Sequence, residues 1–152
     1  MKDVYEQNAD HAGIACAMKN SGVGVGLPDK GRCRLAVRNG VVELYSAASD
    51  IGQGCATVFL QMLAEATGLP LEKLRNMGAN SEVAPDSGTT SGSCQTLITG
   101  EAVRMAAAEL RADLDGAGGD LSALEGLEYS AIKGLRLEAR QKLDRIRPKN
   151  LG

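Results

Sequence analysis

The stretch RCRLAVRNGVVELYSAASDIGQGCATVFLQMLAEATG, residues 32–68, carries most of what the sequence predicts about the fold. RCRLAVR alternates apolar and charged residues, as a half-buried strand does, and VVELYSA follows as a second strand. Asn39-Gly40 lies between the two runs, and this pair is typical of a type I′ hairpin turn because both turn residues need positive φ. The stretch therefore predicts a β-hairpin whose second strand ends near Ala47.

A helix is predicted directly after the hairpin, roughly over residues 55–67. Its apolar residues recur at intervals of one, three and four, which places them on one helix face: Val58, Phe59, Met62, Leu63 and Ala66. Gly68 and Pro70 end it. Hairpin and helix are joined by SDIGQG, residues 49–54, where flanking glycines leave the backbone of Gln53 open to close approach.

The rest of the chain predicts further elements around this unit. GIACAM (13–18) is a short apolar run that fits a buried strand, and LPLEKLRNMGANSE (69–82) fits a turn and a third strand. The polar loop PDSGTTSGS (85–93) leads into a second helix, which ADLDGAGGD (112–120) closes as a linker. The stripe of that helix consists of Val103, Ala106, Ala107, Leu110 and Leu114. We therefore predict an α+β fold, with a β-hairpin and at least one further strand packed against two main helices.

Composition narrows the functional classes. The 152 residues, 43% of them apolar, suffice for one domain with a real core. Lys and Arg number 17 against 19 Asp and Glu, and aromatic residues make up 3%, so nucleic acid is an unexpected partner. No apolar stretch approaches a membrane span or a signal core, so we expect a cytoplasmic protein without a membrane partner. The four cysteines form no C-x-x-C, so we expect reduced, mostly buried thiols and no metal site.

Three segments differ in character. Residues 1–12 form a polar leader, residues 13–130 form the main unit, and residues 131–152 form a basic tail. In the tail, apolar residues that share one helical face allow a basic amphipathic segment: Leu135, Ala139, Leu143 and Ile146. A solvated tail is the simpler interpretation of the same residues.

Two loops, residues 49–54 and 85–93, each precede a predicted helix. Helix N-termini carry unpaired N–H groups and favour anions, so two such loops at one edge would bind an anion through backbone and hydroxyl donors. The alternative is that both loops are only capped connections. Other signals are weaker: GVGVG (22–26) lacks the spacing and helix of a dinucleotide fingerprint, and His11 has no partner motif.

Taken together, residues 41–110 resemble the molybdenum-cofactor-binding large subunit of the xanthine dehydrogenase and aldehyde oxidase family. The features that carry the resemblance are GQG after a hairpin strand, the spacing from Gln53 to PDSGTTSGS, and the TGEAVRMAA helix. The similarity runs from about Gly13 to about Tyr129, so residues 13–130 correspond to part of a molybdopterin-binding domain. The sequence is most similar to the bacterial branch that includes selenium-dependent xanthine dehydrogenases and purine hydroxylases.

The resemblance implies which residues contact the cofactor. In this family the GQG segment lies against the molybdenum–pterin cofactor, and the second loop wraps the pterin and its phosphate end. The implied contacts are Ile51, Gly52, Gln53, Gly54, Thr90, Ser91, Gly92, Ser93, Cys94 and Gln95. In bacterial members the cofactor is commonly a cytosine dinucleotide. Cys94 departs from the pattern, because many bacterial relatives carry arginine there, and its presence removes a charge-assisted phosphate contact.

The resemblance also implies an activity. The family hydroxylates purines, other N-heterocycles or aldehydes with oxygen from water, and electrons leave through iron–sulfur clusters and FAD on other domains or subunits. The glutamate base of that chemistry lies in a later segment with no match here, so we expect a piece of a catalytic subunit that is inactive alone and exposes apolar faces for self-association. A competing hypothesis is a non-catalytic module that binds a partner through the basic C-terminal segment.

Overall fold

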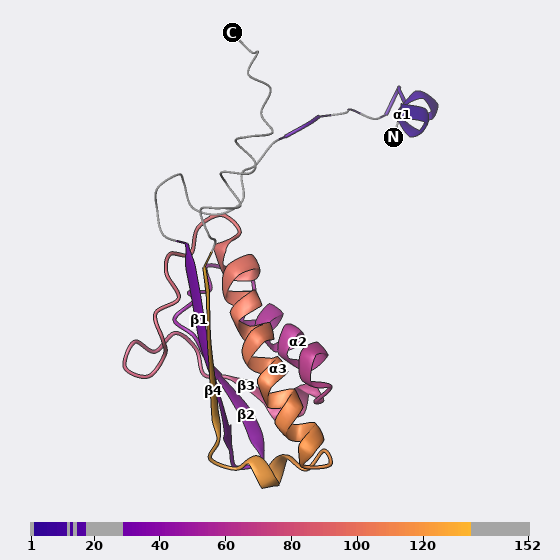
Figure 1. The fold of residues 1–152 in the computed structure, drawn as a ribbon. Coiled ribbons are helices and arrows are strands. Elements are labelled where there is room, and N and C mark those ends of the chain that lie inside the picture. The colour runs from indigo at the N-terminus through magenta and orange to yellow at the C-terminus, as the bar shows by residue number, and fades with distance from the viewer. Residues whose placement is uncertain (1, 12, 14, 18–28, 135–152) are drawn as a thin grey trace, which may run out of the picture.

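The computed structural model describes residues 2–11, 13, 15–17 and 29–134. Residues 29–134 form a four-stranded sheet with helices on one face (Figure 1). The strands are β1 (Lys30–Arg38), β2 (Val41–Tyr45), β3 (Leu74–Asn76) and β4 (Glu128–Gly134), in the spatial order β3-β2-β1-β4. β1 is antiparallel to β2 and β4, whereas β2 is parallel to β3. The α+β architecture predicted from the sequence is confirmed.

The hairpin forms as its turn residues predict. Asn39 and Gly40 have φ of 54° and 70°, so both adopt the positive φ that the type I′ turn requires. Arg38 pairs with Val41 across this turn. Cys33, Leu35 and Val37 alternate along β1 on the face toward the helices, and all three are buried. The half-buried strand read from RCRLAVR is therefore confirmed, although β1 begins two residues earlier.

Two helices cover this apolar face: α2 (Cys55–Thr67) and α3 (Gly100–Gly116) (Figure 1). The predicted bounds of the first helix are confirmed, and the predicted stripe of the second is buried almost completely. Full burial of a large apolar side chain stabilises a fold by about 1.5–3 kcal/mol, so these contacts dominate the stability of the sheet–helix layer. The largest fully buried apolar side chains are Phe59, Leu35, Leu44, Leu63, Leu110, Val37, Val42 and Val103.

The topology brings the beginnings of both helices to the same end of the sheet. β2, α2 and β3 form a parallel crossover, so α2 runs back along the sheet and begins where β2 ends. α3 begins beside the start of β1, because a Cβ added at Gly31 would lie 2.5 Å from Thr99 Cα. The hairpin turn lies at the opposite end (Figure 1). The loops that precede α2 and α3 are therefore neighbours in space.

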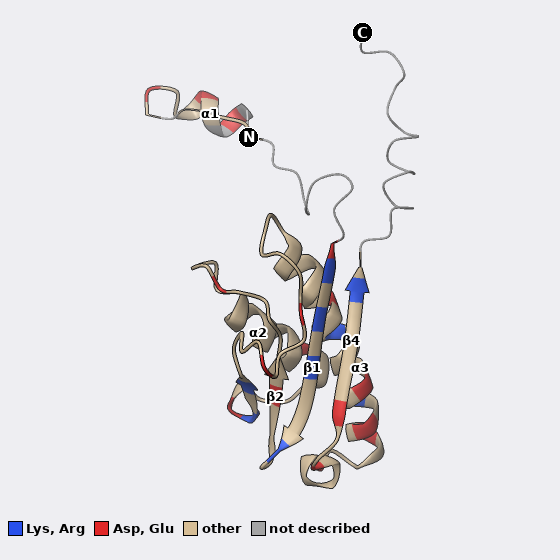
Figure 2. Cartoon of the chain, turned by 90° about the vertical axis from the view of Figure 1, so that its left-hand side faces the viewer, with Lys and Arg blue, Asp and Glu red and all other residues tan. Residues whose placement is uncertain are grey.

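The second face of the sheet carries charges. Arg34 Nη1 lies 2.7 Å from Glu128 Oε1, and Arg38 Nη2 lies 2.9 Å from the same oxygen. The Arg34 guanidinium also lies 4.1 Å from the centre of the Tyr45 ring. Figure 2 shows the basic residues that alternate along β1 beside the acidic start of β4. These ion pairs are partly exposed and contribute little stability, so the apolar face holds the sheet together.

Several predicted boundaries change in the structure. No strand covers residues 13 and 15–17, the described part of GIACAM, because no neighbouring strand pairs with them. ADLDGAGGD is not wholly a linker, since α3 continues through Gly116. The polar leader contains the short helix α1 (Lys2–Gln7).

β4 was not predicted, and residues 131–134 of the basic segment belong to it. Tyr129 and Ala131 of β4 are buried in the core, so this strand is part of the folded unit. The amphipathic segment predicted from Leu135 onward lies outside the described residues. Among the described residues, no helix is both long and apolar enough to span a bilayer.

Candidate functional site at the helix N-termini

The first loop, residues 49–54, is called the GQG loop and is held by its own side chains. The Asp50 carboxylate accepts hydrogen bonds from the backbone N–H of Gly52 at 2.9 Å, Gly54 at 3.2 Å and Ala56 at 3.5 Å. These amide donors, that of Gly52 first, hold the pKa of Asp50 below its ordinary value. Gly52 and Gly54 have φ of 99° and 75°, which only glycine adopts readily, and this lets their N–H groups converge on one carboxylate.

Gln53 folds back onto the same loop. Its Oε1 accepts from the Ile51 N–H at 2.6 Å, and its Nε2 donates to the Ser49 carbonyl at 3.2 Å. The backbone N–H groups of this loop, which the sequence predicted as donors to a bound anion, therefore donate to the side chains of Asp50 and Gln53 in this structure. Ile51 points outward, and 74% of it is exposed. No role was predicted for Asp50, although an aspartate side chain that accepts from the backbone N–H two residues later is the pattern of an Asx-turn.

The second loop, residues 85–93, is called the serine–threonine loop and is anchored on β1. The Ser87 hydroxyl donates to the Arg32 carbonyl at 2.8 Å and lies 2.6 Å from the Ser46 hydroxyl. Gly88 has φ of 70°, and a Cβ added there would lie 2.8 Å from the Lys30 carbonyl oxygen. The beginning of this loop is thus packed directly against the strand backbone.

The serine–threonine loop ends in a π-helical segment, Cys94–Thr99, that continues into α3. Gln95 is 4% exposed and hydrogen-bonds at both ends of its amide: Nε2 donates to Thr90 Oγ1 at 3.1 Å, and Oε1 accepts from Thr99 Oγ1 at 2.7 Å. Thr90 Oγ1 donates in turn to the Ser49 carbonyl at 3.2 Å. That last bond joins the two loops. Single π-helical turns frequently occur at functional sites.

A buried cysteine stands at the start of each helical segment. Cys55 opens α2, where burial raises the pKa of its thiol and Sγ lies 4.0 Å from the Ala48 carbonyl. Cys94 opens the π-helical segment and donates through Sγ to the carboxylate of Asp29, which is itself buried. Cys16 is exposed and Cys33 is buried, so three of the four thiols are buried as predicted.

The ten predicted site residues occupy this one end of the sheet but differ in accessibility. Five are exposed to solvent, namely Ile51, Gly52, Gln53, Ser91 and Gly92, and Thr90 is half-buried. Gly54 and Ser93 are half-buried, whereas the side chains of Cys94 and Gln95 are buried and engaged. Among the described residues, no group of three or more His, Cys, Asp and Glu side chains is placed to hold a metal ion.

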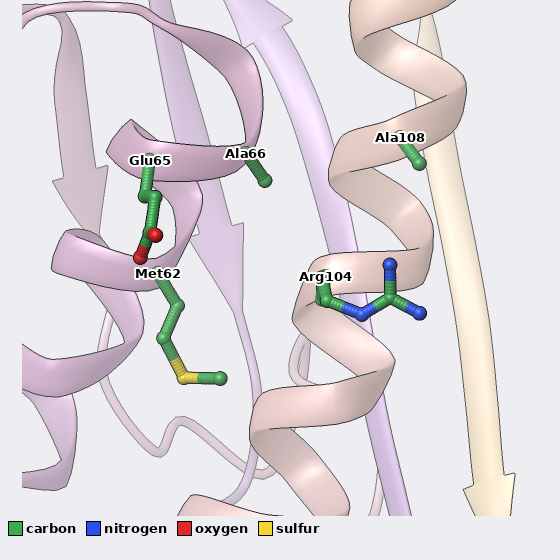
Figure 3. Close-up of a pocket in the computed structure, with 5 residues that line it drawn as sticks. All are labelled: Met62, Glu65, Ala66, Arg104 and Ala108. Carbon is green, nitrogen blue, oxygen red and sulfur yellow. The ribbon is translucent and has the colours of Figure 1, made fainter.

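A separate groove of about 340 Å³ lies between α2 and α3 (Figure 3). Met62, Glu65 and Ala66 line it from α2, and Arg104 and Ala108 line it from α3. Arg104 is bound to Glu101 by two contacts of 2.8 Å. None of the predicted site residues lines this groove, so it is distinct from the two loops.

Comparison with known proteins identifies a family and several relatives. Residues 2–138 match the molybdopterin cofactor-binding domain family. The chain is 34% identical over 101 residues to a xanthine dehydrogenase molybdenum-binding subunit of Escherichia coli O157:H7, an alignment that covers 65% of this chain and 13% of that protein. This chain thus spans about an eighth of the length of that relative.

Solved structures show the same fold. Aldehyde oxidoreductase from Desulfovibrio gigas superposes with a TM-score of 0.59 at 23% identity, covering 75% of this chain and 14% of that one. CO dehydrogenase from Oligotropha carboxidovorans superposes with a TM-score of 0.58 at 19% identity, covering 67% of this chain and 18% of that one. At these identities the superpositions establish the fold alone.

Proposed function

The chain belongs to the molybdopterin cofactor-binding domain family, and we propose that its GQG loop and serine–threonine loop together hold the pterin of the molybdenum cofactor. The observation that carries the proposal is the hydrogen bond between Thr90 and Ser49, two residues 41 apart in sequence, which joins the two loops where two helices begin. A pterin with a phosphate end is rich in oxygen and nitrogen edges, which suit exposed peptide and hydroxyl groups.

The exposed part of the site supplies those groups. We assign contacts with the cofactor to Ile51, Gly52, Gln53 and Gly54 of the GQG loop, and to Thr90, Ser91, Gly92 and Ser93 of the serine–threonine loop. Cys94 and Gln95 would contribute through their backbone, because their side chains are already engaged inside the protein. A cytosine dinucleotide form of the cofactor is part of this proposal.

The reaction that we propose for the parent enzyme is the hydroxylation of a purine, another N-heterocycle or an aldehyde with water-derived oxygen. Molybdenum would supply the redox chemistry, while this chain's residues bind and orient the pterin. The remainder of the large subunit and domains or subunits carrying iron–sulfur clusters and FAD would complete the enzyme. Exposed apolar residues such as Ile132 (60%) and Leu71 (55%) offer surface for such neighbours. We propose that the isolated chain is inactive.

Cofactor retention tests this function directly. The chain would be incubated without oxygen with molybdopterin released from a molybdoenzyme, passed through a desalting column, and assayed for pterin fluorescence after oxidation. We expect retained pterin in the unmodified chain and roughly tenfold weaker retention in Gln53→Ala, the scale of one or two lost hydrogen bonds. Gln61→Ala, an exposed glutamine on α2, is the matched control. Equal retention in all three proteins, or none in the unmodified chain, would argue against the site.

A further inference from the structure

A chain of side-chain hydrogen bonds runs from the core to the GQG loop. Thr99 is completely buried, and its hydroxyl donates to Gln95. Gln95 Nε2 donates to Thr90 Oγ1, and Thr90 Oγ1 donates to the Ser49 carbonyl. Every group in this chain is therefore oriented by the group that lies deeper in the protein.

The inner end of this chain is fixed in place. The absence of a side chain at Gly31 lets the backbone at Thr99 pack on β1. Only 4% of Gln95 is exposed, and a buried amide costs free energy unless its polar atoms are hydrogen-bonded. With Nε2 toward Thr90 and Oε1 toward Thr99, both ends of the Gln95 amide are bonded, and the Thr90 hydroxyl keeps its proton for the Ser49 carbonyl.

The outer end of this series of hydrogen bonds is the Ser49 carbonyl, which Gln53 also contacts. The Ser49 carbonyl accepts from both Thr90 Oγ1 and Gln53 Nε2, using the two lone pairs of one oxygen. Gln53 Oε1 meanwhile holds the Ile51 N–H. A displaced Ser49 carbonyl would therefore also release the inward-folded arrangement of Gln53.

We propose that Gln95 is a positioning residue: it directs the Thr90 hydroxyl at the Ser49 carbonyl and so fixes the GQG loop relative to the start of α3. The functional importance of this role rests on the proposed function. A rigid ligand held by two loops binds most tightly when the two loops already have the right separation before binding. Gln95 needs no contact with the ligand to act in this way. Its influence passes through Thr90.

Hydrogen–deuterium exchange of the GQG loop tests the inference in the isolated chain. We expect the amides of Ile51, Gly52 and Gly54 to exchange about tenfold faster in Thr90→Val and in Gln95→Leu, because one hydrogen bond less is worth about that factor in the local opening equilibrium. The double variant should show no further increase in exchange rate, because both changes interrupt the same series of hydrogen bonds. Thr90→Ser, which keeps the hydroxyl, should restore slow exchange.

Thr89→Val is the control, because Thr89 is an exposed neighbour of the same type. Thr90→Val changes a half-buried surface residue, so the test remains informative even where Gln95→Leu lowers overall stability. Unchanged exchange of the GQG loop in Thr90→Val, or an equal increase in Thr89→Val, would overturn the proposal. Hydrogen exchange needs no cofactor, so the two proposals can fail separately. If the variants show that the two loops are coupled but the protein retains no pterin, Gln95 remains a positioning residue and only the proposed function is refuted.

Discussion

The GQG loop before α2 and the serine–threonine loop before α3 lie side by side, and each leads to a buried cysteine at the start of a helical segment. They are stabilised by different means. In the GQG loop, Asp50 and Gln53 bond to peptide groups no more than six residues away. The serine–threonine loop depends on distant residues: Ser87 bonds to Arg32, and Cys94 bonds to Asp29, 65 residues away. The GQG loop is thus organised mainly by its own residues, with one bond from Thr90 to Ser49, and the serine–threonine loop by the fold, and variants can separate the two cases.

The largest effect is expected where the π-helical segment that follows the second loop packs on β1. In Gly31→Ala the new Cβ would lie 2.5 Å from the Thr99 backbone, which cannot move aside like a flexible side chain. We expect a loss of about 3 kcal/mol in the free energy of unfolding, the upper range for overpacking. Urea denaturation measures it. Gly116→Ala, in open space at the end of α3, should change stability by less than about 1 kcal/mol, and similar losses in both variants would contradict the close packing of Gly31 on the π-helical segment.

A smaller loss is expected for Gln95→Leu. This change leaves the buried hydroxyl of Thr99 without its acceptor, and an unsatisfied buried group costs about 1–3 kcal/mol. We expect a decrease of about 2 kcal/mol in the free energy of unfolding by urea denaturation. Gln61→Leu makes the same chemical change on an exposed position of α2 and should stay within about 0.5 kcal/mol of the unmodified chain. An equally small effect of Gln95→Leu would show that the π-helical segment does not depend on this amide.

Asp50→Ala should act on the GQG loop alone. It removes the acceptor shared by the N–H groups of Gly52, Gly54 and Ala56, so we expect faster hydrogen exchange at these amides and at the first turn of α2. The π-helical segment should exchange as before, because its bonds do not include Asp50. Faster exchange throughout both segments would mean that the local organisation of the first loop is not independent.

The smallest effect is a dependence on acid. Amide donors hold the pKa of Asp50 below 3.8, so its contribution to stability is fully present above that pH and is lost as the pH falls below 3.8 through the folded-state value. An NMR titration of the Asp50 carboxyl should therefore give a midpoint below 3.8. The Gly52 amide should shift with the same midpoint. A midpoint at or above 3.8 would show that the loop is not held by this carboxylate in solution.

The same contrast explains which features could be predicted from the sequence. The hairpin and α2 follow from local signals, namely Asn39-Gly40, the alternation of β1 and the stop at Gly68. β4 escaped prediction because its apolar alternation is limited to Tyr129 and Ala131, and its place in the sheet comes from pairing with β1, about 95 residues earlier in the chain. The π-helical segment likewise depends on the absence of a side chain at Gly31, a distant residue, so the sequence near residues 94–99 could not predict it.

At the site, the position of the two loops before two helices could be predicted from the sequence, but the hydrogen bonds of their side chains could not. A resemblance supplies residue positions, whereas the direction of each side chain depends on its neighbours in the fold. The buried orientation of Gln95 and the contact between Cys94 and Asp29 are of this kind. Asp50 was within reach of sequence analysis, because an aspartate followed by two glycines before a helix predicts a carboxylate that caps peptide N–H groups.

The carboxylate of Asp50 also competes with any external anion for the backbone N–H groups of the GQG loop. Any anion that approaches the N–H groups of Gly52 and Gly54 must displace a group tethered only two to four residues away, whose effective concentration is on the order of millimolar or above. Free phosphate or sulfate at ordinary cellular concentrations therefore gains little at this loop. At the proposed site, a ligand that also contacts the serine–threonine loop would not depend on these N–H groups alone, so the tethered carboxylate would favour large ligands over small anions.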